Sequence, residues 1–347
     1  MVISLFRRKT SVSSKPQSSS VKGKILRRGF GGSRLFAPLT PLPKLACDLF
    51  LLSVRIALVI LLSTARLVVP PSKKSLLGET VLVIVTRELA LTITGAGHGI
   101  GRELAMQLAA LGCVVVCWDT DVEANRDTMS IISKDGGEVH GFVVDVSKRV
   151  EVREAAKLMR KAGIPDVSIL INNAAILMHQ PFLEHKDEDI QKIFDVNVLS
   201  QFWTLQAFLP AMLQNKKGHI VSMCSMCGFY GVVNKVPYCS SKFAIRGLVE
   251  GLHEELRLAA DSSNINFTTV YPFYADTGLA KDPKYRFPYI FGAVSPKYAA
   301  GEVIRAIQRN YEECSIPRCL LYLDVINRVL PKRAMRLIID FLANVKR

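Results

Sequence analysis

Acidic residues are almost absent from the first 78 residues of the chain. This stretch holds fourteen lysines and arginines but a single acid, Asp48. It therefore carries +13 of the formal net charge of +15, and residues 79–347 are close to neutral. A strongly basic protein can bind nucleic acid or an anionic surface. Because the charge is confined to one end, we expect no nucleic-acid partner for the rest of the chain.

Other scarcities exclude whole classes of protein. With 22 glycines, 16 prolines and 49% hydrophobic residues, the chain is neither fibrous nor disordered throughout. It has no Gly-x-Ser-x-Gly elbow, which argues against a serine hydrolase of that kind. The six histidines form no pair at metal-ligand spacing, and Cys224-x-x-Cys227 has no second pair to complete a zinc site. We therefore expect no metal site, and reduced cysteines in an intracellular protein.

The N-terminal 45 residues have the composition of a disordered arm. They are rich in Ser, Gly, Pro and basic residues and contain no acid. An acid-poor, Arg- and Ser-rich N-terminus is also typical of an organelle transit peptide, which leaves the mitochondrion as an alternative location.

An apolar segment follows the arm. Leu49–Val69 is close to the length that spans a bilayer as a helix, and we assign residues 46–70 to a membrane anchor. Its few charged residues, Asp48, Arg55 and Arg66, would share one narrow face, which suits a helix lying in the membrane interface. A buried core helix is the alternative. Pro70 and Pro71 end the segment, and residues 71–78 form a linker.

From residue 79 onward the pattern alternates short β-branched runs with longer amphipathic stretches. Strand, helix and strand in repetition predict an α/β fold, a doubly wound parallel sheet of the Rossmann type. Ligands in such folds bind beyond the carboxyl ends of the strands. The runs that we expect to form strands are Val114–Trp118, Val139–Val144, Val167–Ile171, His219–Met223 and Ile265–Tyr271.

A glycine-rich turn links the run Leu89–Thr94 to a predicted helix that ends near Leu111. Glycines let such a turn be tight and let the backbone approach a pyrophosphate at the helix N-terminus. Asp119 ends the next strand, where an acid accepts hydrogen bonds from the ribose hydroxyls and repels a 2′-phosphate. We therefore expect NAD as cofactor, with NADP possible if Arg102 or His98 weakens the preference; alternatively Asp119 is a solvated turn residue or a helix cap. The turn residues that we expect to bind the cofactor are Gly95, Gly97, His98, Gly99, Ile100 and Gly101.

These motifs, together with Ser225 placed 13 residues before Tyr238 and the run Tyr238-x-x-x-Lys242, resemble the short-chain dehydrogenase/reductase family over essentially all of residues 79–347. The N-terminal apolar segment and the run Tyr271–Gly278 are most similar to its membrane-associated retinol dehydrogenase and 17β-hydroxysteroid dehydrogenase type 11/13 group. The resemblance implies that further cofactor contacts come from Asp145, Val146, Asn172, Ala174, Pro272 and Thr277, as well as from Tyr238 and Lys242.

The resemblance also implies a catalytic set of Asn197, Ser225, Tyr238 and Lys242. An unperturbed tyrosine is a poor base at neutral pH. Lys242 follows Tyr238 by one helical turn, and with the oxidised nicotinamide it would lower the tyrosine pKa. Ser225 would hold the substrate oxygen, and Asn197 would keep a water chain that links Lys242 to solvent. Lys242 would also hold the nicotinamide ribose, and Thr277 the carboxamide.

The substrate and partners follow from the flanking segments. An aromatic-rich stretch, Leu279–Ser295, is expected to cover a lipophilic alcohol such as retinol or a steroid; a surface loop is the alternative. The basic C-terminal run Ile316–Arg347 predicts an amphipathic helix that contacts either the membrane or the substrate entrance. We expect a homodimer at the endoplasmic reticulum membrane or a lipid-droplet surface, with the catalytic domain facing the cytosol. A lipid-surface interaction protein with a vestigial dehydrogenase domain is the alternative function.

One feature departs from the family pattern. Both Thr80–Val85 and Leu89–Ile93 look like strands, so the chain holds about nine or ten residues more than the first strand needs. We expect Leu89–Thr94 to form the central strand and the earlier run to be extruded.

Overall fold

The computed structural model describes residues 42–84, 99–259, 264–274, 292–322 and 329–342. The chain divides into two compact units, Met1–Val68 and Val69–Arg347. In the first unit, α1 runs from Leu42 to Val68, several residues earlier than the expected start, with Pro43 in its first turn, where the missing N–H costs no hydrogen bond. Its segment Ala46–Arg66 is long and apolar enough to cross a membrane. The large apolar side chains described along it are exposed.

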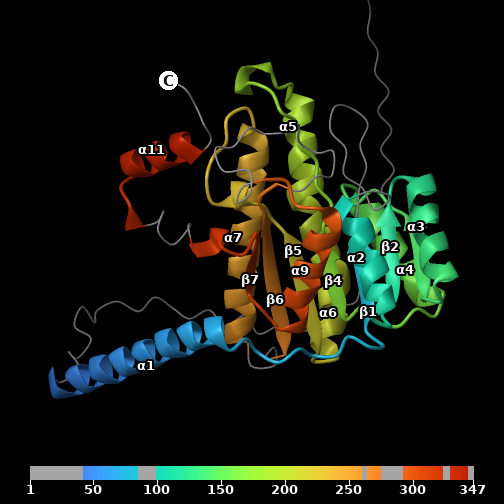
Figure 1. Cartoon of the computed structure of the whole chain (residues 1–347). Helices are drawn as coiled ribbons and strands as arrows, with labels where there is room; N and C mark the ends of the chain where they lie inside the picture. The colour runs from blue at the N-terminus through green and yellow to red at the C-terminus, as the bar shows by residue number, and fades with distance from the viewer. Residues whose placement is uncertain (1–41, 85–98, 260–263, 275–291, 323–328, 343–347) are drawn as a thin grey trace, which may run out of the picture. The chain divides into compact units, whose positions relative to one another are not determined.

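The second unit is built on a seven-stranded parallel sheet in the order β3-β2-β1-β4-β5-β6-β7 (Figure 1). This is the predicted doubly wound arrangement. The strands are β1 (Thr80–Ile84), β2 (Val114–Asp119), β3 (Val139–Val143), β4 (Ile169–Asn172), β5 (Gly218–Met223), β6 (Ile265–Pro272) and β7 (Glu313–Ile316). The five predicted strands are confirmed to within two residues at their ends. The short edge strand β7 was missed, because its sequence Glu-Cys-Ser-Ile has no apolar run.

Helices cover both faces of the sheet, and alternate residues of each strand supply two cores. In β1, Val81 and Val83 pack on the face of α2 (Gly99–Ala110), α3 (Val122–Lys134) and α9 (Pro296–Gln308). Leu82 and Ile84 pack on the opposite face, with α4 (Arg149–Lys161), α6 (Ser200–Gln214) and α7 (Val236–Leu258). The remaining described elements are α5 (Asp187–Phe194) with a π-helical turn after it (Asp195–Leu199), two 3-10 turns (Phe182–Glu184 and Met226–Gly228), and α11 (Lys332–Leu342).

The expectation for the central strand was wrong. Thr80–Ile84, not Leu89–Thr94, is β1, and it pairs with β2 on one side and β4 on the other. The side chains of Val81, Leu82 and Val83 are fully buried. A run of five apolar or β-branched residues that enters the sheet directly from the linker can bury both faces at once, as a central parallel strand requires. Residues 85–98, which include Leu89–Thr94, lie outside the described residues.

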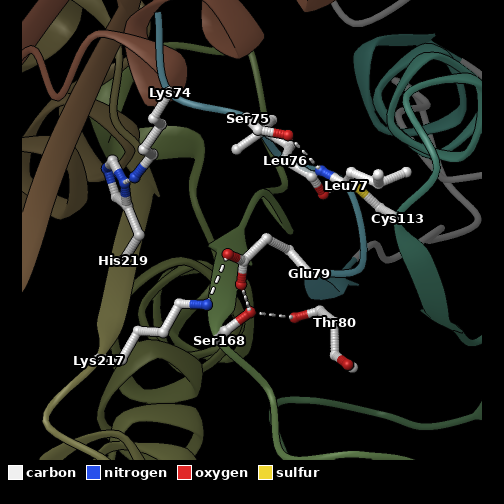
Figure 2. Close-up of polar contacts among 10 residues, drawn as sticks. All are labelled: Lys74, Ser75, Leu76, Leu77, Glu79, Thr80, Cys113, Ser168, Lys217 and His219. Atoms are coloured by element: carbon white, nitrogen blue, oxygen red, sulfur yellow. Dashed lines mark hydrogen bonds and ion pairs between the residues drawn. The ribbon is translucent and has the colours of Figure 1, made fainter.

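The linker before β1 is tied to the amino-terminal edge of the sheet, and we call residues 71–79 the strap. The carbonyl of Pro71 accepts from the Arg309 guanidinium, and Leu76 is buried. At its end, Glu79 accepts from Ser168 Oγ at 2.5 Å and pairs with Lys217 Nζ at 2.7 Å (Figure 2). Burial alone would raise the pKa of Glu79, but the hydrogen bonds with Lys217 and Ser168 lower it.

Candidate active site

Ser225 lies at the carboxyl edge of the sheet. It follows the end of β5 by two residues and caps the 3-10 turn Met226–Gly228. This turn packs tightly on α7, because a Cβ at Gly228 would come within 2.7 Å of Cys224 Sγ and 3.2 Å of the Lys242 carbonyl oxygen. Only glycine fits such an approach. The sheet edge therefore brings Ser225 to the helix that carries Tyr238 and Lys242.

Tyr238 and Lys242 lie one turn apart near the start of α7, as their spacing predicted. Both are buried, with exposed fractions of 7% and 1%. Lys242 Nζ lies 5.4 Å from the centre of the Tyr238 ring and donates to the carbonyl of Met223 at 2.9 Å. Burial lowers the pKa of Lys242 to about 8, so the ammonium form still predominates at neutral pH.

The phenol of Tyr238 meets the Ser225 hydroxyl. Burial raises the pKa of Tyr238 well above its usual range, and the hydrogen bond with Ser225 opposes that rise. Ser225 Oγ also accepts from the Cys227 N–H at 3.1 Å and lies 3.4 Å from the Pro272 carbonyl oxygen. The protein thus holds Ser225 and Tyr238 together in a buried environment that favours the protonated phenol.

Asn197 lies in the π-helical turn that links α5 to α6 and is fully buried. Its Oδ1 accepts from the Ile176 N–H at 2.8 Å, and its Nδ2 donates to the Ile176 carbonyl at 3.0 Å and to Ser241 Oγ at 3.0 Å. Ser241 Oγ in turn donates to the carbonyl of Tyr238 at 2.7 Å. Asn197 therefore fixes the segment after β4 to the start of α7, and its water-chain role stays a prediction.

On the cofactor side, the structure describes the start of α2 and the ends of β2 and β3. Gly99 begins α2 with φ of +74°, a conformation that glycine adopts without strain. Asp119 ends β2, is fully buried and accepts from the Asp121 N–H at 2.9 Å. The cap of α3 is Asp121, so Asp119 is neither a helix cap nor a solvated turn residue.

Asp145 and Val146 follow β3, where Val146 is buried. The Asp145 carboxylate accepts from Ser147 N–H at 3.0 Å and Ser147 Oγ at 2.6 Å, and it pairs with Lys148 at 3.3 Å. These contacts hold the carboxylate at the carboxyl end of β3, and its contact with the cofactor stays a prediction.

These residues fit a nicotinamide dinucleotide. Asn172, the last residue of β4, is 3% exposed, and within the described part of the chain its Nδ2 has no hydrogen-bond partner, although its Oδ1 accepts from Thr204 at 2.8 Å. A buried amide donor left open at the carboxyl edge suits a polar ligand there. Ala174, beyond it, is buried. Four of the expected contacts, Gly95, Gly97, His98 and Thr277, lie outside the described residues. Ile100 and Gly101 lie in the first turn of α2.

Three contacts at this site were not predicted from the sequence. Ser241 lies within the run from Tyr238 to Lys242 and could have been recognised as a link to Asn197 only from the fold. The evident cysteine pair, Cys224 and Cys227, does not meet, because the Cys224 thiol donates to the Lys242 carbonyl at 3.2 Å. Cys227 meets Cys239 instead. Among the residues that the structure describes, no group of side chains could hold a metal ion.

Comparison with known proteins agrees with this architecture. A family model described as short chain dehydrogenase matches residues 90–285. Epidermal retinol dehydrogenase 2 of Mus musculus is 38% identical over 276 residues, which cover 79% of this chain and 85% of the relative. Estradiol 17-beta-dehydrogenase 11 of Homo sapiens is 36% identical over 304 residues, which cover 88% of this chain and 94% of the relative.

Solved structures show the same fold. A metagenomic short-chain oxidoreductase in complex with NADP is 27% identical, with a TM-score of 0.55 over 68% of this chain and 92% of that one. A short-chain dehydrogenase/reductase from Burkholderia phymatum in complex with NAD is 24% identical, with a TM-score of 0.60 over 71% of this chain and 92% of that one.

The fold and the edge of its sheet define an oxidoreductase of the Rossmann type that uses a nicotinamide cofactor. The chain belongs to the short-chain dehydrogenase/reductase family. The family match begins at residue 90, whereas β1 ends at Ile84, so the sequence pattern and the sheet use different strand-like runs before the glycine-rich turn. The relatives are named as dehydrogenases, and nothing in them favours a non-enzymatic lipid-surface protein.

Proposed function

We propose that this chain is a membrane-associated dehydrogenase that oxidises a lipophilic alcohol, such as retinol or a steroid, with NAD as the preferred cofactor. The observation that carries the proposal is the meeting of Ser225, Tyr238 and Lys242 at the carboxyl edge of the sheet. Its substrate class follows from the relatives, which are named for retinol and estradiol.

Each of the three side chains has a distinct part in the proposed reaction. The oxidised nicotinamide, when bound, supplies the hydride acceptor. Ser225 Oγ holds the alcohol oxygen by a hydrogen bond, and Tyr238 accepts the alcohol proton. Lys242, whose ammonium lies 5.4 Å from the phenol ring, stabilises the phenolate and holds the nicotinamide ribose. Asn197 keeps the start of α7 in place through Ser241.

The cofactor contacts are proposed residue by residue. Gly99 and Gly101 at the start of α2 would hold the pyrophosphate with the helix N-terminus, and Asp119 would accept from the adenosine ribose. Asp145 with Val146 would hold the adenine. We also propose Pro272 and Thr277 as contacts to the nicotinamide.

Replacement of Tyr238 by phenylalanine tests the catalytic proposal. Because the variant lacks the proton acceptor, we expect kcat/KM for retinol to fall by roughly a thousandfold, while NAD still binds. Turnover is followed at 340 nm in detergent, and NAD binding by titration calorimetry. The control, Tyr298→Phe, changes an exposed tyrosine on α9 and keeps wild-type activity. Retained turnover in Tyr238→Phe would refute the assigned base.

The membrane association is a separate proposal. It rests on α1, where Ala46–Arg66 is long and apolar enough to cross a bilayer and the basic arm would meet anionic headgroups. We propose an arm (residues 1–45), an anchor (46–70), a linker (71–78) and a dehydrogenase domain (79–347), placed on the endoplasmic reticulum membrane or lipid droplets with the domain in the cytosol. The apolar residues Leu337, Ile338 and Phe341 of α11 are exposed and would make a second contact with lipid.

A fusion of residues 1–78 to a fluorescent protein tests the anchor. We expect fluorescence on the endoplasmic reticulum or on lipid droplets. In the double variant Leu58→Arg with Leu61→Arg the fluorescence should become diffuse, because each arginine near the middle of the segment raises the free energy of membrane insertion by about 3 kcal/mol. Leu58→Ile with Leu61→Ile is the matched control. A diffuse wild-type signal removes the case for an anchor, and a mitochondrial signal favours the transit peptide.

The proposed homodimer is tested by sedimentation velocity of the full chain in detergent.

A further inference from the structure

Two thiols from different elements meet beside Tyr238. Cys227 lies in the 3-10 turn after Ser225, and Cys239 follows Tyr238 in the first turn of α7. Both are buried, and they share one small apolar cluster with Tyr238 and Leu177. Their thiols lie close enough for each to shift the pKa of the other. Neither thiol has a part in the proposed hydride transfer.

The surroundings make the two thiols unequal. Cys239 Sγ accepts from the Val232 N–H at 3.4 Å, and it lies near Lys235 and within the first turn of a 23-residue helix. Donors, a nearby cation and a helix N-terminus all stabilise a thiolate. The neighbouring Cys227 thiol, together with these groups, lowers the pKa of Cys239, whereas the Cys239 thiol and burial raise the pKa of Cys227. Cys239 is thus the attacking thiol, and Cys227 is the partner that keeps its proton.

Cys239 can also be reached from outside. It lines an open surface pocket of about 600 Å³, together with Val232, Val236 and Phe243. Cys227 is not among the pocket residues. A small oxidant that enters the pocket therefore meets Cys239 first.

We propose that Cys239 and Cys227 form a reversible disulfide when the protein meets a low-molecular-weight disulfide such as glutathione disulfide. The Cys239 thiolate attacks one sulfur of the small disulfide, which breaks its S–S bond, releases one thiol and leaves a mixed disulfide on Cys239. Cys227 then loses its proton, attacks the Cys239 sulfur and expels the second thiol. The pair is oxidised by two electrons, and one small disulfide is reduced to two thiols.

The bond would act on the catalytic site through both of its ends. The Cys227 N–H donates to Ser225 Oγ, and Cys239 adjoins Tyr238. A disulfide holds its sulfurs about 2.05 Å apart in a fixed geometry, so the bond would cross-link the turn that positions Ser225 to the helix that carries Tyr238. Because displacement by about 1 Å at a reacting centre can cost a hundredfold in rate, we expect the disulfide to switch the enzyme off. This consequence, unlike the bond itself, rests on the proposed function.

The experiment uses the reduced full chain in detergent, incubated with graded ratios of oxidised to reduced glutathione. Free thiols are blocked with N-ethylmaleimide, and the digest is analysed by mass spectrometry. We expect a cross-linked peptide joining Cys227 to Cys239, with two hydrogens lost. Retinol turnover should fall in parallel by roughly a hundredfold, and dithiothreitol should restore it. The variants Cys239→Ser and Cys227→Ser should keep activity through oxidation, while Cys319→Ser, which changes an exposed thiol, should respond as wild type.

The outcomes separate the disulfide from the dehydrogenase. If glutathione adducts form on Cys47 and Cys319 while the pair stays reduced, the disulfide is overturned, whatever the activity. If the cross-link forms and turnover is unchanged, the switch is overturned. If the reduced chain shows no turnover with any alcohol, the proposed function fails, and the peptide map still decides whether the disulfide exists.

Discussion

Lys74 Nζ lies 2.9 Å from His219 Nδ1 and joins the strap to the start of β5. An ammonium can only donate, so Nδ1 accepts and the proton of the neutral ring resides on Nε2. Nε2 donates to Thr268 Oγ1 at 2.8 Å, and that hydroxyl donates to the Tyr311 carbonyl at 2.6 Å. One directed chain of hydrogen bonds thus runs from the strap across β5 and β6 to the segment before β7. Figure 2 shows Lys74 and His219 facing each other, with Glu79, Ser168 and Lys217 at the other end of the strap.

Removal of the Lys74 ammonium should loosen this chain. Lys74→Met leaves a buried imidazole nitrogen without its donor, so we expect the free energy of unfolding to fall by about 1–3 kcal/mol. Urea unfolding of residues 69–347, if soluble, or of the full chain in detergent measures the loss. Lys73→Met, which changes the exposed neighbour, should stay within experimental error of wild type. Equal losses for both variants would show that the contact with His219 contributes nothing.

The same histidine should make stability depend on pH. Burial lowers the pKa of His219 to about 3, and the charge of Lys74 adds to the effect. In the unfolded chain the pKa returns to about 6.5. Above that pH neither state binds the proton, so stability is fully present. As the pH falls from about 6.5 toward 3, only the unfolded chain binds it, and the free energy of unfolding decreases by about 1.4 kcal/mol per pH unit.

Urea unfolding of wild type and His219→Gln at pH 7 and pH 5 isolates this group, because the other titrating groups are common to both chains. We expect wild type to lose about 2 kcal/mol more than His219→Gln between the two values. Identical losses would mean that His219 is protonated in the folded chain, contrary to its burial.

The buried charge of Asp119 should set the choice of cofactor. Asp119→Asn keeps an acceptor for the Asp121 N–H and removes the charge that would face a 2′-phosphate. Since like charges placed together cost several kcal/mol, we expect the ratio of NADP to NAD affinity to rise by roughly two orders of magnitude. Binding by titration calorimetry measures both cofactors.

The matched control is Asp121→Asn on the same loop. Asp121 caps α3 through the Glu123 and Ala124 N–H groups, and asparagine keeps the accepting oxygen, so this variant removes a nearby charge and should leave the cofactor ratio unchanged. A shift of equal size in both variants would mean that loop geometry, not the Asp119 charge, selects the cofactor.

Local sequence patterns predict much of this fold. The strand runs are β-branched and buried, the spacing from Tyr238 to Lys242 is one helical turn, and the position of Asp119 at a strand end follows from the strand itself. What local patterns cannot give is the partner of a residue. Cys227 lies three residues from Cys224 yet meets Cys239, because the 3-10 turn folds its side chain toward α7. The structural role of Asn197 is likewise visible only in the fold, where its side chain hydrogen-bonds to the backbone of Ile176.

The prediction of the central strand was wrong for the same reason, because strand pairing is not visible in a local sequence pattern. Thr80–Val85 and Leu89–Ile93 both look like strands from the sequence, and pairing with β2 and β4 identifies Thr80–Ile84 as β1. The strap adds a long-range constraint, since Glu79 is held by Ser168 and Lys217 immediately before β1. These contacts hold the residue before β1 against β4 and β5, which helps to fix the register of β1 in the sheet.

Matched truncations of one leucine in each run test this choice. Leu82 is fully buried in β1, so Leu82→Ala should lower the free energy of unfolding by about 2–5 kcal/mol. Leu91→Ala is the companion variant from the second run. If Leu89–Thr94 held the centre of the sheet instead, Leu91→Ala would carry the larger loss and Leu82→Ala would be nearly neutral. Both substitutions remove the same atoms. If the two variants have the same denaturant slope, the difference between their urea midpoints compares how deeply the two leucine side chains are buried.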